Sequence, residues 1–184
     1  MTQILGISGS LRKGSFNTAL LHAAQNLMPE GSTLVEGSIA EIPLYNADEE
    51  QAHGLPEAVV RLKEQIIAAD GVILFSPEYN NSIPGVLKNA IDWTSRPASD
   101  ISKVFGGKPF AVLGASPGGF GTILSQDAWL SVLRTLTTRQ WHEGRLMVAR
   151  AGDVFDENGA MTDEKTTERL KAYLAGFTEF AAAQ

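Results

Sequence analysis

Short apolar runs alternate along the chain with longer amphipathic stretches. The runs predict strands at residues 4–7, 33–39, 71–75, 110–115 and 145–149. The amphipathic stretches predict helices at 19–27, 55–69, 84–94 and 123–136, and a last helix from about Thr162 onward. Strands that alternate with helices form a parallel sheet with right-handed crossovers and helices on both faces. The pattern therefore predicts an α/β fold.

The length of 184 residues suits one domain with a sizeable core, and the pattern contains no linker or repeat. We expect a single domain over residues 1–184, built on a doubly wound, five-stranded parallel sheet in the flavodoxin-like order 2-1-3-4-5. Two segments fall outside the alternation. The acidic segment 42–53 is expected to be irregular, and the polar segment 96–107 is expected to be a surface excursion.

Three of the predicted loops are rich in Gly, Ser, Asn and Pro. They span residues 8–17, 76–82 and 116–121, and each follows the carboxyl end of a strand. Ligands of such sheets bind beyond these ends, at the point where the strand order reverses. The sequence therefore predicts one binding site that the three loops build together.

The first loop has the character of a phosphate site. A turn from a strand into a helix offers unpaired N–H groups and the positive end of the helix dipole. Arg12 adds a cation, and Ser10, Ser15, Asn17 and Thr18 add side-chain donors. The glycines have the spacing of a P-loop, but Ser15 stands where that motif needs a lysine. The alternative is an ordinary loop in which Ser15 or Asn17 caps the helix.

Composition argues against several classes of function. The net charge of −6 and the pI near 5.1 disfavour nucleic acid or an anionic membrane surface as a partner. The lack of cysteine removes disulfides and thiolate chemistry, and the three scattered histidines do not indicate a metal site. No apolar run reaches membrane-spanning length, and the N-terminus leads directly into the first strand. We therefore expect a cytoplasmic protein without a metal.

Two motifs carry a resemblance to a known family. The run from Gly9 to Asn17 (GSLRKGSFN) and the run from Pro77 to Trp93 (PEYNNSIPGVLKNAIDW) resemble the signature of the NADPH-dependent FMN reductases. The branch that is most similar contains the bacterial chromate and quinone reductases. This resemblance implies FMN as cofactor, NADPH or NADH as co-substrate, and a homodimer or a dimer of dimers. With an exposed flavin, quinones, chromate or similar compounds would serve as electron acceptors. Because one small domain leaves no room for a separate dinucleotide-binding domain, we expect NAD(P)H to leave before the acceptor enters the same space, which is a ping-pong mechanism.

The resemblance assigns roles to matching positions, with the hydride chemistry on N5 of FMN and no separate catalytic side chain. The residues implied at the FMN phosphate are Ser10, Arg12, Ser15, Phe16 and Asn17. Those implied at the flavin ring are Pro77, Glu78, Tyr79 and Asn80, with Ser116, Gly118 and Gly119 from the third loop. Ser82 and Gly85 are implied on the substrate side. Lys88, Asp92 and Trp93 are candidate interface residues, although Trp93 also fits a core position and the two charges also fit a solvated face.

Two other functions remain as alternatives. Residues 114–118 (GASPG) match the nucleophile elbow of serine hydrolases, with Ser116 as nucleophile and His142 and Asp127 as partners. Pro117 weakens this reading, because the oxyanion hole of that fold needs a backbone N–H at the residue after the serine. An electron carrier resembling flavodoxin is the second alternative, and reduction of the flavin by NAD(P)H without a partner protein would distinguish it.

Overall fold

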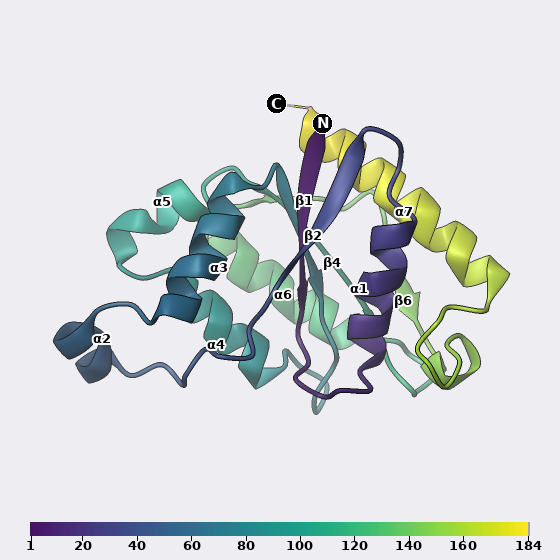
Figure 1. Cartoon of the computed structure of the whole chain (residues 1–184), viewed down its shortest axis with the longest axis horizontal. Coiled ribbons are helices and arrows are strands. Elements are labelled where there is room, and N and C mark those ends of the chain that lie inside the picture. Colours follow the sequence, from purple (N-terminus) through teal and green to yellow (C-terminus); the bar gives the residue numbers. More distant parts are fainter. Residues whose placement is uncertain (184) are drawn as a thin grey trace.

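A parallel sheet forms the centre of the protein, whose computed structural model describes residues 1–183 (Figure 1). Its strands are β1 (Thr2–Ser8), β2 (Ser32–Gly37), β3 (Gly71–Phe75), β4 (Pro109–Ala115), β5 (Arg139–Gln140) and β6 (Met147–Val148). They lie in the order β2-β1-β3-β4-β5, with β6 also paired to β4. All of these pairs are parallel. The predicted flavodoxin-like order is therefore confirmed.

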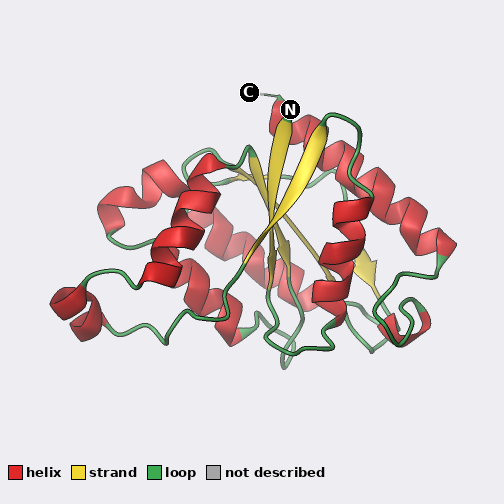
Figure 2. Ribbon diagram, viewed as in Figure 1, coloured by secondary structure: helices red, strands yellow, loops and turns green. Residues whose placement is uncertain are grey.

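Helices cover both faces of this sheet (Figure 2). They are α1 (Phe16–Asn26), α2 (Ala47–His53), α3 (Glu57–Ala68), α4 (Gly85–Thr94), α5 (Ile101–Val104), α6 (Ile123–Thr135) and α7 (Glu164–Ala182), with 3₁₀ turns η1 (Ala98–Asp100) and η2 (Ala151–Asp153). Within residues 1–183, no helix combines the length and the apolar character that a membrane span requires.

Two separate cores hold the layers together. Ile4 of β1 and Ile73 of β3 point to the face that α1 and α7 cover. Leu5 of β1 and Val72 of β3 point to the opposite face, where α3, α4 and α6 pack. Successive side chains of a strand alternate between the faces, so a strand buried on both sides is apolar throughout. This explains the continuous apolar sequence Gly71–Phe75, all of which is buried.

The end of the sheet differs from the prediction of one strand at 145–149. β4 pairs at its start with β5 and at its end with β6, two strands of two residues each. The chain leaves the sheet between them, and Trp141 turns into the core beside Tyr173 of α7, with ring centroids 4.8 Å apart. Position five of the sheet is therefore divided, and the sequence pattern missed β5.

The segment 42–53 is not irregular throughout, as predicted, because it contains α2. Asn46 caps this helix by accepting a hydrogen bond from the Asp48 N–H at 3.0 Å. None of its residues is buried. An ion pair between Arg96 and Glu50, at 2.9 Å, connects the helix to the chain after α4.

The segment 96–107 is also more than a surface excursion. It contains η1 and α5 and buries the side chains of Val104 and Phe105 completely. The ammonium group of Lys63, on α3, lies 2.7 Å from the Asp100 carboxylate, which fastens η1 to the helical layer. Because Lys63 is 8% exposed, its partner is needed to compensate a desolvated charge.

Candidate active site

The three loops meet at the carboxyl edge of the sheet and enclose a pocket of about 440 Å³. The loops that follow β1 and β3 lie together at the lower end of the sheet in Figure 1. The pocket is lined by Ser10, Arg12, Ser15, Phe16, Asn17, Pro77, Glu78, Tyr79, Ala115, Ser116 and Pro117. Two other hollows are larger, at about 540 and 560 Å³, so volume does not identify the site. The site is identified by its position, beyond the strand ends where the strand order reverses, and by its polar lining.

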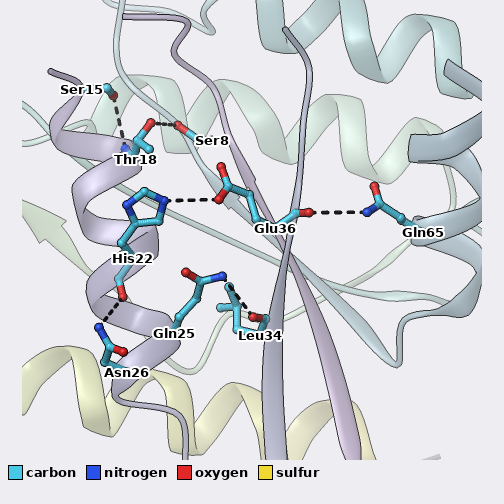
Figure 3. Close-up of polar contacts among 9 residues, drawn as sticks. All are labelled: Ser8, Ser15, Thr18, His22, Gln25, Asn26, Leu34, Glu36 and Gln65. Carbon is cyan, nitrogen blue, oxygen red and sulfur yellow. Dashed lines mark hydrogen bonds and ion pairs between the residues drawn. The ribbon is translucent and has the colours of Figure 1, made fainter. Parts of the chain in front are cut away.

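Ser15 is the N-cap of α1, which agrees with the alternative prediction that Ser15 or Asn17 caps this helix. Its hydroxyl oxygen accepts hydrogen bonds from the Asn17 N–H at 3.2 Å and the Thr18 N–H at 3.3 Å. The Thr18 hydroxyl in turn lies 2.8 Å from the hydroxyl of Ser8, at the end of β1 (Figure 3). The start of α1 is therefore fixed to the strand that precedes it.

The first loop also presents free donors. Among residues 1–183, no acceptor pairs with the backbone N–H of Ser10, Leu11 or Phe16. Phe16 is the first residue of α1, so the positive end of the helix dipole lies at the same place. The exposed guanidinium of Arg12 stands 5.6 Å from the centre of the Phe16 ring. These groups suit an anion such as a phosphate.

Asn17 differs from the other polar residues of this loop. Asn17 is only 3% exposed, and its carboxamide is turned towards β4. The Nδ2 group donates to the Ala115 carbonyl at 2.9 Å, and Oδ1 accepts from the Ala115 N–H at 2.9 Å. Sequence reasoning did not identify Ala115 as a partner, because the two residues are 98 positions apart.

The second loop contains a tight turn at residues 79–82. Tyr79 and Ser82 exchange two backbone hydrogen bonds, each 3.1 Å long. The central residues, Asn80 and Asn81, have φ of 51° and 61°, a conformation that asparagine adopts more readily than most residues. Tyr79 is 47% exposed beside the pocket. Asn80 takes part in the turn through its backbone, and Ser82 closes the turn. The exposed Gly85 is the first residue of α4.

The Glu78 carboxylate points away from the second loop to α6. Its Oε2 accepts hydrogen bonds from the Leu124 N–H at 2.8 Å and the Ser125 N–H at 3.1 Å. The cap residue of α6, Thr122, makes no side-chain cap hydrogen bond, so Glu78 supplies that cap from another loop. No sequence signal indicated this role.

In the third loop, the Ser116 hydroxyl borders the pocket and donates to the Gly121 carbonyl at 2.6 Å. Gly118 and Gly119 lie on the exposed tip of the loop, outside the pocket lining. His142 and Asp127 line a different hollow. Within the described chain no histidine bonds to Ser116, so the geometry does not support a hydrolase triad.

Comparisons with known proteins show the family of the chain. The family model of NADPH-dependent FMN reductases matches residues 2–153. The chain belongs to this family. It is 45% identical over 172 residues to an NAD(P)H-dependent FMN reductase of Pseudomonas aeruginosa, covering 94% of this chain and 91% of the relative. It is 38% identical over 181 residues to a quinone reductase of Escherichia coli K12, covering 97% and 94%.

Among solved structures, the flavoenzyme NAD(P)H:(acceptor) oxidoreductase of Paracoccus denitrificans superposes with a TM-score of 0.87. It is 34% identical and the match covers 98% of this chain and 97% of that structure. As an FMN reductase, the protein is an oxidoreductase that uses FMN and NAD(P)H. Its three-loop pocket fits that cofactor, because free N–H groups and Arg12 suit the phosphate and Tyr79 and Ser116 leave room for a planar ring.

The predicted interface residues of this FMN reductase divide into two groups. Lys88 and Asp92 are partly exposed on α4 and pair with each other at 2.6 Å. Trp93 is 1% exposed, and its Nε1 donates to the Pro43 carbonyl at 2.8 Å. Trp93 therefore takes the core position that was its alternative role, while its assignment to an interface stays a prediction.

Proposed function

We propose that this FMN reductase is an NAD(P)H:quinone oxidoreductase that admits NAD(P)H and the acceptor to the same open site in turn. The observation that carries the proposal is the combination of one cofactor pocket with exposed residues at its mouth, Arg12, Tyr79 and Pro117. The quinone reductase of Escherichia coli, 38% identical, supports quinones as the acceptor class.

The chain's own residues bind and orient, while FMN supplies the hydride chemistry when it is bound. The N–H groups of Ser10 and Phe16, with the Arg12 guanidinium, would hold the phosphate. The backbone of the second loop and Ser116 would border the ring. Tyr79, half-exposed, would line the space that a nicotinamide or a quinone enters.

Because both substrates would use one space, we expect ping-pong kinetics. A planar quinone and a nicotinamide cannot occupy the same position together, so one has to leave before the other enters. Steady-state rates should then give parallel double-reciprocal lines when NADPH is varied at several quinone concentrations. We extend the proposal to chromate, a small oxyanion that the same exposed site would admit.

The test begins with the purified protein loaded with FMN and kept anaerobic. NADPH or NADH should bleach the flavin absorbance, and 1,4-benzoquinone should restore it. Intersecting kinetic lines would overturn the ping-pong order, and a failure of benzoquinone to restore the absorbance would overturn the acceptor class. A flavin that neither nucleotide bleaches would identify an electron carrier instead.

We also propose that the protein self-associates through α4, as a homodimer or a dimer of dimers. The exposed pair of Lys88 and Asp92 supports this surface, because both charges are available on one side of the helix.

A further inference from the structure

The Asn17 carboxamide makes a closed pair of hydrogen bonds with the backbone of one residue. It donates to the Ala115 carbonyl and accepts from the Ala115 N–H, both at 2.9 Å. Ala115 is the last residue of β4, whereas Asn17 belongs to the first turn of α1. We call this arrangement the Asn17 clasp.

The clasp reaches across a strand. In the sheet order β2-β1-β3-β4-β5, β3 separates the strand that leads to Asn17 from the strand that ends at Ala115. The clasp therefore joins two loops that no direct strand pairing connects. The residue before Asn17 is Phe16, whose N–H suits the phosphate, and the residue after Ala115 is Ser116, which borders the ring space.

We propose that Asn17 is a positioning residue, which sets the phosphate-binding turn at a fixed distance from the ring-binding loop and does not itself hold the phosphate. Its side chain is 3% exposed and both of its polar atoms are engaged with Ala115. Turning the carboxamide towards a phosphate would leave the buried N–H and carbonyl of Ala115 without partners, which is costly. The inference rests on FMN binding in the three-loop pocket.

Riboflavin separates positioning from direct phosphate contact, because it carries the ring without the phosphate. Loss of the clasp frees Ala115 and with it the adjacent Ser116 of the ring-binding loop, so we expect Asn17→Ala to weaken the binding of both FMN and riboflavin, roughly tenfold to a hundredfold. Fluorescence titration of the apoprotein measures both dissociation constants. In the flavin-free protein, amide hydrogen exchange at Ala115 should become faster, since its N–H loses the Oδ1 acceptor.

A second variant covers the case in which Asn17→Ala fails to fold. Asn17→Asp keeps the oxygen that accepts from the Ala115 N–H but faces the Ala115 carbonyl with a second oxygen. Riboflavin binding should weaken while exchange at Ala115 stays slow, and the absence of a phosphate in riboflavin removes charge repulsion as an explanation.

Asn89 provides a matched control on α4. It forms the same pair of bonds, donating to the Pro43 carbonyl at 2.8 Å and accepting from the Tyr45 N–H at 2.9 Å. Asn89→Ala should lower the unfolding temperature and leave both flavin affinities unchanged. If Asn17→Ala weakens FMN alone, the ring-binding loop does not depend on the clasp and the inference is wrong; unchanged affinities for both flavins also overturn it. Failure of the wild-type protein to bind FMN would instead refute the function.

Discussion

At the scale of single residues, Glu78 belongs to the second loop of the candidate site, but its carboxylate caps the helix α6. It accepts two backbone N–H bonds at the start of α6, from Leu124 and Ser125. A charged acceptor at a helix N-terminus satisfies unpaired donors and interacts favourably with the helix dipole. The second loop is thereby fixed to the start of α6, to which the carboxylate is turned.

We predict that Glu78→Ala lowers the free energy of unfolding by about 1–2 kcal/mol, because the N-terminus of α6 loses its cap. Glu78→Gln keeps an acceptor oxygen and loses only the charge, so its cost should be about 0.3–1 kcal/mol. Urea unfolding of the apoprotein measures both values. Glu157→Gln, at an exposed position, is the control. Equal stability of all three variants would contradict the capping role.

Arg12 offers the opposite case, an exposed side chain beside the free donors of the first loop. We predict that Arg12→Ala weakens FMN binding by roughly tenfold to a hundredfold, because a charge-assisted hydrogen bond to phosphate is lost. Riboflavin binding should be unchanged. The measurement is the same fluorescence titration, repeated at higher salt, where the wild-type affinity for FMN should fall more steeply than that of the variant.

At the scale of elements, the sequence predicted well wherever burial imposes a pattern. The strand at 71–75 was found with its observed bounds, because an apolar run buried on both faces has no polar interruption. The helix α2 was missed, since none of its residues is buried and a helix without a buried face has no apolar periodicity. The strand β5, with two residues, is too short for any pattern.

In the candidate site, the sequence predicted the loops that line the pocket but not the hydrogen bonds that join them. Most of the predicted phosphate and ring residues line one pocket, because parallel strands end at one edge. They are Ser10, Arg12, Ser15, Phe16, Asn17, Pro77, Glu78, Tyr79 and Ser116, whereas Asn80, Gly118 and Gly119 are not among the lining residues. What the sequence did not reveal are the bonds of Asn17 to Ala115 and of Glu78 to α6. Both join loops through partners distant in sequence, whose spacing carries no local signal.

The close approach of β4 to the neighbouring loops depends on Gly114. A Cβ atom at this position would lie 2.2 Å from the Ser76 carbonyl oxygen and 2.3 Å from Thr122 Oγ1. We predict that Gly114→Ala destabilises the protein by about 1–3 kcal/mol, because the end of β4 has to move away from the second loop. Gly152→Ala, where a Cβ would meet nothing within 4 Å, is the control in the same thermal unfolding assay. A Gly114 variant as stable as this control would contradict the packing argument.

At the scale of the whole molecule, a layer of helices covers each face of the sheet. The α1 and α7 layer closes one core, and the α3, α4 and α6 layer closes the other. On α4, Trp93 is buried inside the chain, so only the outer residues of that helix are available to a second copy. The partly exposed residues Lys88 and Asp92 are the charged groups of α4 that an interface on this helix would meet.

We predict that the wild-type protein has at least twice the chain mass of 19.7 kDa in light scattering, and that Lys88→Glu shifts it towards the monomer. The substitution places two like charges at the surface, whereas its cost within the helix is only a few tenths of a kcal/mol. Lys171→Glu is the matched control, because Lys171 pairs with Glu168 at 2.7 Å on α7, away from the proposed interface. A monomeric wild-type protein would refute the interface, and an equal shift in both variants would show that the effect is one of net charge rather than of α4.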